Sequence, residues 1–261
     1  MAFARENKAF NANIYRNRLF GDGGFKKVYA GVYADGLRKG QDCVAKEFKS
    51  GTVVEDHYFA EELRICAKAQ QIIDKFNEQG IMHQEIRLNA PEIWTYAAGR
   101  KTGHKALVEP MILNFEKFNS NTGWVLEDIT GWSAALQSLS HFSYHITGGK
   151  YLLCDLQGGR YNDGFILTDP VIMSRAGDRG PADLGKEGMR LFFQEHQCTP
   201  FCEKSWLKPS GICKAKIPRR RGTTMFAYLP DGRSRLPLSK ESQPRDPKEL
   251  CRECGDRKKK S

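Results

Sequence analysis

The stretch from about residue 54 to residue 77 contains neither glycine nor proline, and it restricts the fold more than any other feature of the chain. Apolar side chains recur in it near helical spacing, at Phe59, Leu63, Cys66, Ala67, Ile72 and Phe76. This periodicity predicts a long amphipathic helix. Segments typical of strands precede it at residues 25–33 and 43–48 and follow it at 93–97 and 106–112. Strands, one long helix and further strands predict a compact α+β lobe.

A turn-rich segment at residues 119–123 separates this lobe from a second one. Beyond it, Trp132, Ala135, Leu136 and Leu139 repeat at i, i+3, i+4 and i+7 and predict a helix that ends close to His141. Residues 144–146 and 151–156 flank Thr-Gly-Gly-Lys, which predicts a β-hairpin, and a further helix is expected over about 183–194. We therefore expect an N-terminal lobe at residues 1–112, a C-terminal lobe at 113–229 and, where Pro, Ser, Arg and Lys dominate, a flexible basic tail at 230–261.

The composition of the 261 residues is that of a soluble globular protein, with 40% hydrophobic and 28% charged residues. No apolar run reaches the roughly 18 residues that a membrane helix needs. The first residues also lack the apolar core of a signal peptide. These observations predict a cytoplasmic protein without a membrane partner.

The net charge of +10 favours an anionic partner, such as nucleotide phosphates, an acidic protein or nucleic acid. Much of the excess is local, in basic runs at residues 214–221 and 258–260. Because basic runs near a chain end are usually solvated and flexible, nucleic acid is the least favoured of these partners.

Eight cysteines in a chain expected in the cytoplasm argue against a disulfide framework and for a metal site or buried thiols. Cys43, Cys66 and Cys154 stand alone in apolar stretches, as small buried hydrophobes do. Cys251 and Cys254 form a single CxxC, which is half of a metal knuckle and is more often incidental in a charged tail.

Three soft ligands lie within seven residues in His196-x-Cys198-x3-Cys202, directly after the second predicted helix of the C-terminal lobe. Zn²⁺ prefers four nitrogen and sulfur ligands in a tetrahedron, and a helix end with its following loop can supply three of them. His141, at the end of the other helix, is a candidate for the fourth. Such a closed site would tie the two helices together and leave no position for a reactive water. The spacing is not a standard finger spacing, so buried thiols with exposed histidines are an equal alternative.

Two features of the first lobe suggest phosphate binding. Gly21-Asp22-Gly23-Gly24 opens a strand, and glycines let backbone N–H groups approach an anion closely. A plain hairpin turn would have the same composition. Lys46 stands in the apolar strand at residues 44–48, from which a lysine typically reaches phosphate oxygens in nucleotide enzymes. An edge-strand lysine that faces water is the alternative.

Two carboxylates of the second lobe each follow an apolar strand. Asp155 stands in Cys-Asp-Leu-Gln-Gly and Asp169 in Leu-Thr-Asp-Pro. Together they could share a Mg²⁺–nucleotide complex, because Mg²⁺ prefers hard oxygen ligands and retains several waters. Carboxylates at strand ends are also ordinary turn residues, so neither residue alone decides the chemistry.

Taken together, these segments resemble the alpha-kinase family, which includes the myosin heavy chain kinases, the elongation-factor-2 kinases and the kinase domains fused to certain ion channels. The matching segments follow the family's order across roughly residues 15–208. They are residues 24–29, Val44-Ala45-Lys46, Val108-Glu109-Pro110, residues 117–123 and 140–144, Asp155-Leu156-Gln157-Gly158, Leu167-Thr168-Asp169-Pro170, residues 180–185 and the His/Cys cluster at 196–202. The resemblance implies an α+β, two-lobed, atypical protein-kinase-like fold with a zinc-stapled C-terminal lobe.

The resemblance also implies roles for individual residues. Lys46 would contact the phosphates of ATP, and Glu109 would lie at the hinge between the lobes near the adenine. Asp155 would orient or deprotonate the substrate hydroxyl, and Gln157 and Asp169 would hold Mg²⁺. The family's zinc ligands match His141, His196, Cys198 and Cys202, which favours structural zinc over free thiols.

The nucleotide site implied by the resemblance also includes Gly23, Gly24 and Asp183. The family usually has Asn where Asp183 stands, so this carboxylate would add a negative charge near the phosphates or the peptide site. The partner of Lys46 is open, and Glu61 and Glu62 of the long helix are candidates.

The implied activity is that of a serine/threonine protein kinase that transfers the γ-phosphate of ATP to protein substrates with Mg²⁺. The chain has no H-R-D-L-x-x-x-N and no D-F-G, so Asp155 and Asp169 would fill the corresponding positions. One alternative is a kinase-fold scaffold that Asp183 makes catalytically weak. Another is a zinc-stabilised nucleic-acid-binding module that uses the basic run and the CxxC. The sequence indicates neither the physiological substrate nor the oligomeric state.

Overall fold

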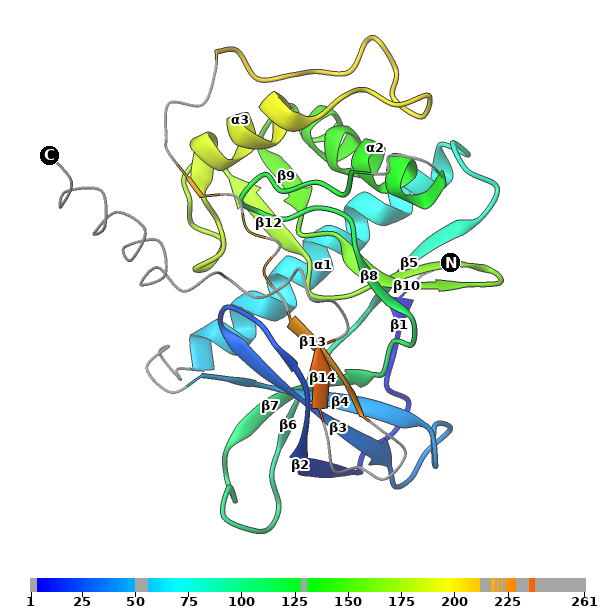
Figure 1. Ribbon diagram of the computed structural model, residues 1–261, viewed down its shortest axis with the longest axis vertical. Helices are drawn as coiled ribbons and strands as arrows, with labels where there is room; N and C mark the ends of the chain where they lie inside the picture. The colour runs from blue at the N-terminus through cyan, green and yellow to red at the C-terminus, as the bar shows by residue number, and fades with distance from the viewer. Residues whose placement is uncertain are drawn as a thin grey trace, which may run out of the picture.

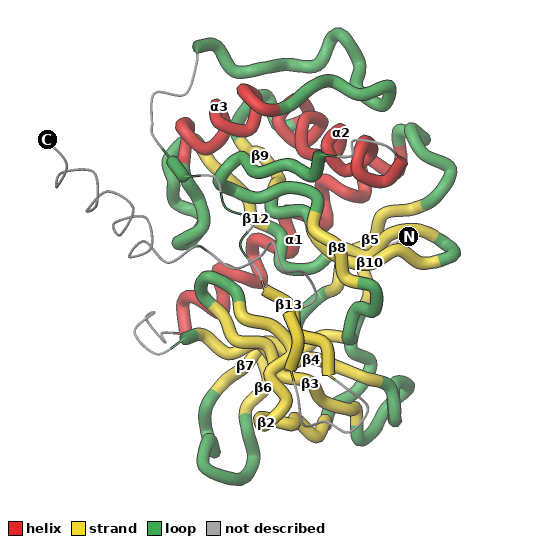
Figure 2. The backbone as a smooth tube through the Cα atoms, in the orientation of Figure 1, coloured by secondary structure: helices red, strands yellow, loops and turns green. Residues whose placement is uncertain are grey.

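A computed structural model describes residues 4–49, 56–127 and 131–211 of the chain, together with 217, 218, 220, 222, 224–228 and 235–237. Two lobes lie one above the other in Figure 1, and helix α1 (Asp56–Glu78) runs obliquely between them. Strands dominate the lower lobe, whereas the upper lobe contains α2 (Gly131–Ile146) and α3 (Gly185–Glu195), as Figure 2 shows. The fold is therefore the two-lobed α+β arrangement that the sequence predicts.

The lower, N-terminal lobe is built on a sheet with the strand order β14-β13-β2-β3-β4-β7-β6, in which neighbouring strands are antiparallel. Strand β4 carries five successive buried residues, because the sheet is covered on both faces there. The four strands predicted from sequence are confirmed, each within two residues at its ends. In the order of the chain, the strands span Ala12–Asp22 (β2), Lys26–Tyr33 (β3), Asp42–Phe48 (β4), Glu92–Thr95 (β6), Lys105–Pro110 (β7), Thr224–Tyr228 (β13) and Arg235–Pro237 (β14).

The upper, C-terminal lobe combines α2 and α3 with a sheet of order β1-β5-β11-β10-β8 and with the antiparallel pair β12-β9. Strand β5 pairs in parallel with both β1 and β11. The strands of this lobe are Ala4–Arg5 (β1), Glu85–Asn89 (β5), Phe115–Lys117 (β8), Tyr151–Cys154 (β9), Gln157–Tyr161 (β10), Gly164–Leu167 (β11) and Val171–Ser174 (β12).

The two lobes exchange segments of chain. Strands β1 and β5 precede residue 112 and yet belong to the sheet of the upper lobe. Strand β13 precedes residue 229, β14 lies within the segment predicted as a tail, and both extend the sheet of the lower lobe. The boundaries predicted at residues 112 and 229 therefore do not coincide with sheet membership, because strand partners far apart in sequence leave no local signal.

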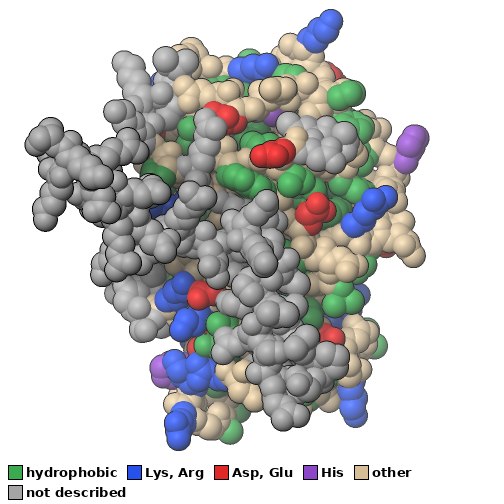
Figure 3. All heavy atoms as spheres, viewed as in Figure 1, with side chains coloured by type: hydrophobic (Ala, Val, Ile, Leu, Met, Phe, Trp, Pro, Cys, Tyr) green, Lys and Arg blue, Asp and Glu red, His purple; other side chains and the backbone are tan. Residues whose placement is uncertain are grey.

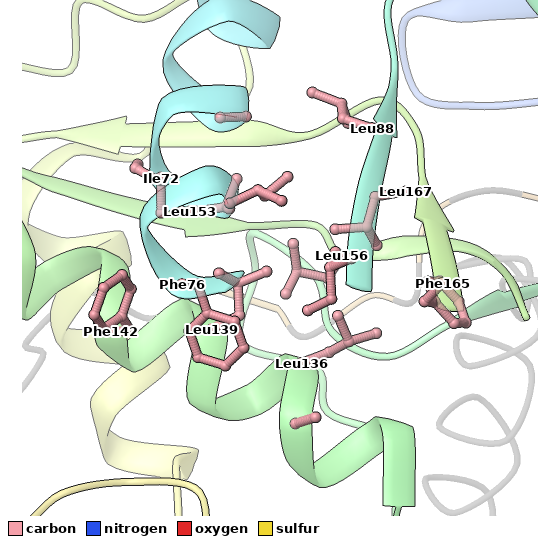
Figure 4. Close-up of a cluster of buried hydrophobic side chains, with 14 of the residues drawn as sticks. Ile72, Phe76, Leu88, Leu136, Leu139, Phe142, Leu153, Leu156, Phe165 and Leu167 are labelled. Atoms are coloured by element: carbon pink, nitrogen blue, oxygen red, sulfur yellow. The ribbon is translucent and has the colours of Figure 1, made fainter. Parts of the chain in front are cut away.

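Helix α1 is the long helix predicted from the glycine-free run, and its buried face packs into the core of the upper lobe. The residues of α1 in this core are Ile65, Cys66, Ala69, Ile72, Ile73 and Phe76, whereas the buried Phe59 meets Phe48 of β4 edge to face with ring centroids 5.0 Å apart. In Figure 4, Phe76 lies beside Leu139 of α2 and Ile72 lies near Leu153, and the rings of Phe76 and Phe142 meet edge to face with centroids 5.4 Å apart. Each fully buried Ile or Phe of this face contributes about 1.5–3 kcal/mol. Ala67, expected on this face, is exposed instead.

Helix α2 is longer than predicted and takes the place of half of the expected hairpin. It continues to Ile146, so His141 lies inside it and residues 144–146 form its last turn rather than a strand. The Gly-Gly pair ends the helix: the Gly149 N–H donates to the Tyr144 carbonyl at 2.7 Å, and both glycines have positive φ. Every residue from Trp132 to Tyr144 is buried, so no polar stripe marked the end of the helix in the sequence.

Lysine and arginine side chains gather along one side of the lower lobe in the face that Figure 3 shows. The positive charge of the chain is therefore not confined to its basic runs near the C-terminus. Among the described residues, no helix combines the length and the apolar character that crossing a membrane requires.

Candidate active site

The turn between β2 and β3 lies at a cleft between the lobes. In this turn the Gly23 N–H donates to the Lys26 carbonyl at 2.9 Å, and Gly23 and Gly24 line the cleft. The cleft is partly open to solvent. The upper lobe contributes polar residues to its wall, namely Lys117, Asn121, Asp155, Gln157, Asp169 and Arg179.

Asp169 is the centre of a charged cluster in this cleft. Its two carboxylate oxygens lie 2.9 Å from Lys26 Nζ and 2.8 Å from Lys46 Nζ. Each lysine has a second carboxylate partner, because Lys46 Nζ lies 2.9 Å from Glu109 Oε1 and Lys26 Nζ lies 2.7 Å from Glu62 Oε2. The cluster therefore joins the glycine-rich turn, the sheet of the lower lobe, helix α1 and the end of β11.

The partners predicted for Lys46 are wrong. Glu62 binds Lys26, and Glu61 faces Arg179, with 3.5 Å between the Glu61 carboxylate and the guanidinium. Glu109 of β7, and not a glutamate of α1, is the partner of Lys46, because β4 and β7 are neighbours in the sheet.

The electrostatics of the cluster keep its lysines and Asp169 ionised. Burial alone would raise the pKa of Asp169, but the ammonium groups of Lys26 and Lys46 outweigh it and hold that pKa well below its usual value. Burial alone would also lower the pKa of each lysine. The carboxylates of Asp169 and Glu62 around Lys26, and of Asp169 and Glu109 around Lys46, outweigh it and raise both pKa values.

Glu109 belongs to β7 and is almost completely buried, at 2% exposure. Its Oε1 also accepts hydrogen bonds from the Thr168 hydroxyl at 2.5 Å and from Asn89 Nδ2 at 3.2 Å. It lines an apolar pocket next to the charged cluster, as the hinge prediction implies, but its carboxylate is directed to Lys46. The apolar walls of this pocket are Phe20, Val28, Val44, Ile112 and Phe115.

Asp155 and Asp169 share an uncommon backbone conformation. Their φ angles are 59° and 48°, in the left-handed region that few residues other than glycine adopt. Strain of this kind concentrates at functional sites, where the surrounding structure holds it in place. Asp155 Oδ1 lies 2.8 Å from Lys117 Nζ, and Oδ2 accepts a hydrogen bond from Gln157 Nε2 at 3.0 Å. The carboxylate of Asp155 is thereby held in one orientation at the wall of the cleft.

Asp183 is not among the residues that line the cleft. Its carboxylate accepts hydrogen bonds from the backbone N–H groups of Ser174, Arg179 and Gly185 at 3.1, 3.0 and 2.8 Å. The Ser174 hydroxyl donates to it as well, at 2.7 Å. The predicted contact of Asp183 with the nucleotide is therefore not supported, because the carboxylate organises its own loop.

The four predicted metal ligands lie together, with the ligand atoms of His141, His196, Cys198 and Cys202 all within 4.8 Å of one another. Cys198 Sγ lies 3.7 Å from His141 Nδ1, and Cys202 Sγ lies 3.7 Å from His196 Nε2. A tetrahedral zinc ion with ordinary bond lengths has N···S edges of about 3.6 Å. These two N···S separations match the edges of a zinc tetrahedron, and the four side chains form a cluster that could hold a metal ion.

The protonation of the two histidines also suits a metal. Burial lowers the pKa of His141 to about 4 and that of His196 to about 3, so both imidazoles are neutral at physiological pH. The Nε2–H of His141 donates to the Leu207 carbonyl at 3.1 Å and leaves Nδ1 directed to Cys198. Such a bond from the second ring nitrogen typically orients a ligating histidine.

Two lysines of the site were missed by sequence reasoning, which assigned no role to Lys26 or Lys117. Both stand in segments quoted for the family resemblance. Lys117 is 3% exposed and directly precedes a buried Phe-Asn-Ser segment. Its position beside that segment was a usable signal, because a lysine that is buried almost always has a charged partner. Lys26 is half-buried, and the glycines and Phe25 that precede it gave no comparable signal.

The site combines a cleft between two lobes, a glycine-rich turn, two lysines around one carboxylate and a second carboxylate held by a lysine. This is the arrangement of charges that phosphoryl transfer from a nucleotide needs. The profile of the alpha-kinase family matches residues 21–202, which is more than half of the chain. The chain belongs to the alpha-kinase family.

Similarity to individual proteins agrees with this membership. The chain is 38% identical over 125 residues to myosin heavy chain kinase C of Dictyostelium discoideum, in a match that covers 47% of the chain and 15% of that protein. It is 38% identical over 106 residues to human eukaryotic elongation factor 2 kinase, covering 40% and 13% respectively. A match to human transient receptor potential cation channel subfamily M member 6 has 29% identity over 202 residues and covers 70% of the chain and 10% of that protein. The chain thus spans a small part of these relatives.

Solved structures show the same fold. The alpha-kinase domain of myosin-II heavy chain kinase A in complex with AMP-PNP superimposes with a TM-score of 0.62 at 22% identity, over 74% of this chain and 86% of that chain. An alpha kinase from Entamoeba histolytica gives a TM-score of 0.60 at 20% identity, over 77% and 82%.

Proposed function

We propose that the chain is an ATP-dependent protein kinase that phosphorylates serine or threonine side chains of protein substrates. The observation that carries the proposal is the arrangement of two aspartates with positive backbone φ, whose carboxylates lie in one cleft. Asp169 lies between the ammonium groups of Lys26 and Lys46, and Asp155 is fixed by Lys117. Family membership and relatives that are named as kinases of proteins support the same reading.

The adenine of ATP suits the apolar pocket bounded by Phe20, Val28, Val44, Ile112 and Phe115, which is contiguous with the cleft through Val28, Gln157 and Asp169. From there the phosphates reach the turn at Gly23 and Gly24, whose backbone can approach an anion closely. Lys26 and Lys46 lie below this turn and supply the positive charge that phosphoryl transfer needs.

The transfer itself requires a positioned hydroxyl more than covalent help from the protein. The substrate oxygen forms a bond to the γ-phosphorus while the bond between that phosphorus and the bridging oxygen of ADP breaks. Asp155 accepts the hydrogen bond of the attacking hydroxyl and takes its proton. Lys117, 2.8 Å from Asp155, keeps the carboxylate oriented and places a positive charge beside the transferred group.

Gln157 and Asp169 are the residues that we propose to hold Mg²⁺ with the nucleotide. Both line the cleft, and both side chains carry oxygen atoms, which are the ligands that Mg²⁺ prefers. When bound, the ion neutralises charge on the phosphates.

We further propose that His141, His196, Cys198 and Cys202 hold a structural zinc ion. The N···S spacings and neutral imidazoles support this assignment, and a set of four protein ligands leaves no coordination position for chemistry. His141 lies in α2, and the other three ligands follow α3. The site would therefore brace α2 and α3 near strand β9, which ends one residue before Asp155.

The alternative of a catalytically weak scaffold depended on a negative charge from Asp183 among the phosphates. The hydrogen bonds of Asp183 to its own loop remove that basis. No observation among the described residues favours the nucleic-acid-binding alternative.

Incubation of the chain with Mg-ATP and a generic basic protein should give phosphate transfer to serine or threonine, and Asp155→Ala should abolish it. Asp163→Ala is the matched control, because Asp163 is exposed in the β10–β11 turn and pairs with Arg87 at 2.6 Å, outside the cleft. Phosphate transfer that persists fully in Asp155→Ala would exclude the assigned mechanism, and phosphotyrosine as the product would exclude the assigned specificity.

A further inference from the structure

The chain passes from strand β7 of the lower lobe to strand β8 of the upper lobe through residues 111–114, which we call the crossing segment. Two side chains from distant parts of the chain bind its backbone. Arg5 Nη1 donates to the Met111 carbonyl at 3.2 Å, and the Leu113 N–H donates to the Tyr161 hydroxyl oxygen at 3.2 Å. The two side chains also meet each other, because the Arg5 guanidinium lies 5.7 Å from the centroid of the Tyr161 ring.

The backbone around Arg5 is itself anchored to both lobes. Arg5 belongs to β1, which pairs with β5 of the upper lobe, and its carbonyl accepts a hydrogen bond from the Ala90 N–H at 3.0 Å. Two residues further on, Asn7 is completely buried and bonds to the lower lobe. Its Nδ2 donates to the Val108 carbonyl at 3.0 Å, and its Oδ1 accepts a hydrogen bond from the Tyr33 hydroxyl. Arg5 is therefore held in a fixed position relative to the crossing segment.

The crossing segment forms part of the apolar pocket and rests on strand β10, which lies beside β8 in Figure 1. Ile112 lines the pocket. A Cβ added to Gly159 of β10 would lie only 2.4 Å from the Leu113 carbonyl oxygen and 2.5 Å from Cγ2 of Ile112, so the segment lies directly on the backbone of this strand. Strand β10 begins at Gln157, a proposed Mg²⁺ ligand, and ends at Tyr161. The wall of the pocket and the strand that carries Gln157 are thus held together through Tyr161.

An adenine in the apolar pocket would pack against Ile112, so its binding depends on the position of the crossing segment. We propose that Arg5 and Tyr161 are positioning residues for nucleotide binding, which act by holding the crossing segment against β10. Neither residue lines the cleft or the apolar pocket, so the effect passes through the crossing segment and not through contact with the ligand. The proposal rests on the proposed kinase function, which identifies the ligand as a Mg–adenine nucleotide.

A pocket that is formed only part of the time binds its ligand with an affinity reduced by the formed fraction. Two full-length variants release the crossing segment in different ways. Arg5→Met removes the guanidinium and keeps a long side chain, whereas Tyr161→Phe removes the hydroxyl and keeps the ring beside Arg5.

Isothermal titration calorimetry with Mg-AMP-PNP measures the effect. We expect Kd to rise by about threefold to tenfold in Arg5→Met and in Tyr161→Phe, as lost hydrogen bonds of ordinary strength imply. Arg5→Lys keeps a cationic donor and should restore most of the affinity. Because both residues hold the same segment, the double variant should lose less than the product of the two single losses. KM for Mg-ATP should rise by the same factor as Kd, and KM for myelin basic protein as substrate should stay unchanged.

Each variant has a matched control in the same chain. Arg175 also donates to backbone carbonyls, those of Gly149 and Gly148 at 2.9 and 3.2 Å, but it lines neither the cleft nor the apolar pocket. Arg175→Met therefore tests the loss of a guanidinium elsewhere in the fold. The Tyr96 hydroxyl donates to Glu47 Oε1 at 2.9 Å, also outside both sites, so Tyr96→Phe tests the loss of a hydroxyl. Both controls should keep the wild-type Kd.

A second measurement does not depend on the nucleotide. Amide hydrogen exchange of the ligand-free chain, followed by mass spectrometry on peptides that cover residues 111–115, reports local opening of the crossing segment. Exchange there should be faster in Arg5→Met and Tyr161→Phe than in wild type, and unchanged in the two controls.

Several results would overturn the proposal. They are a Kd within about twofold of wild type in both variants, an equal weakening in the controls, an equal rise in KM for the protein substrate, and weaker Mg-AMP-PNP binding without faster exchange at residues 111–115. If the wild-type chain binds no Mg-AMP-PNP, the proposed kinase function fails. Hydrogen exchange alone then decides whether Arg5 and Tyr161 hold the crossing segment.

Discussion

Glu109→Gln removes a negative charge from the most buried part of the catalytic cluster and keeps the shape of the side chain. The side chains of Glu109 and Lys46 are only 3% and 4% exposed, whereas Asp169, the other carboxylate partner of Lys46, is 26% exposed. The variant therefore leaves Lys46 with the one carboxylate that water reaches. We expect the folded state to be destabilised, because a buried ammonium group loses its buried counter-charge.

The size of the effect follows from what Lys46 keeps. Removing one partner of a buried ion pair costs about 3–5 kcal/mol when the remaining charge has no other partner. Lys46 retains Asp169 Oδ2 at 2.8 Å and the Thr168 hydroxyl at 2.7 Å, so a loss below that range is expected, about 2–3 kcal/mol. For a protein of this size each kcal/mol shifts Tm by about 2–4 °C, which gives a decrease of about 4–12 °C.

Urea denaturation and thermal melting of the full chain measure the loss, with Glu92→Gln as the control. Glu92 lies in β6 of the same sheet, is exposed and accepts a hydrogen bond from Trp94 Nε1 at 2.9 Å, so its replacement should change stability by less than about 0.5 kcal/mol. The deficit of Glu109→Gln should be equal at pH 6 and pH 9. The pKa of Lys46 is raised above its ordinary 10.5, so its stabilising interactions are fully present below that value and are lost only as pH rises through the folded pKa.

Two results would refute the reasoning. If Glu109→Gln is within about 0.5 kcal/mol of wild type, the charge at Glu109 does not stabilise Lys46. If the deficit disappears between pH 6 and pH 9, Lys46 loses its proton in that interval in the variant, and Asp169 and Thr168 do not keep it charged.

Three further predictions concern other parts of the molecule. Cys198→Ser or chelation should lower Tm by about 10 °C or more, because a structural metal contributes directly to folding; well under one zinc per chain by metal analysis would contradict the site. Asp169→Asn should abolish phosphate transfer and reduce the loss of stability that acid causes below about pH 4. The pKa of Asp169 is lowered from 3.8, so its contribution to stability is present above that value and is lost as pH falls through the folded pKa. A variant that loses stability below about pH 4 as steeply as wild type would contradict this. Glu61 of α1 and Arg179 of the loop before α3 lie 3.5 Å apart. Glu61→Arg and Arg179→Glu should each lower kcat/KM by about twofold to fivefold, and the double reversal should restore it. Additive losses in the double variant would show that the pair is not coupled.

The features that could be predicted from sequence are those that short contiguous segments carry. Lys46, Asp155, Gln157 and Asp169 stand within or next to strands whose apolar runs were visible, and the structure brings all four to one pair of adjoining pockets. The helix of residues 54–77 was visible for the same reason, since its apolar periodicity is local. His141 differs, because it is far in sequence from the other three candidate zinc ligands. The fourth ligand therefore stayed open until the family resemblance indicated His141.

Two kinds of feature could not be predicted. Some depend on residues far apart in the chain, and others on a sequence pattern that fits two different local structures equally well. Lys46 pairs with Glu109 because β4 and β7 are neighbours, and nothing in either segment indicates that pairing. Gly148 and Gly149 supply positive φ equally well for a hairpin turn and for the end of a helix, and the aromatic and β-branched residues before them favoured the wrong choice. The pairing of β13 with β2 joins segments about 200 residues apart, a separation at which no local pattern operates.

The position of Asp169 between two lysines has a consequence for the order in which the proposed kinase takes up its ligands. As long as both carboxylate oxygens are bonded to ammonium groups, a divalent cation arriving alone must compete with two positive charges, and nucleotide phosphates arriving alone must draw those charges away from the carboxylate. When the two arrive together, the phosphates take the lysines and the cation takes the carboxylate, so each ligand removes the obstacle to the other. Such reciprocity is thermodynamic linkage: each ligand raises the affinity for the other by the same factor. In the absence of ligands the charge of Asp169 is balanced by Lys26 and Lys46, so the site should bind the metal–nucleotide complex more tightly than either component.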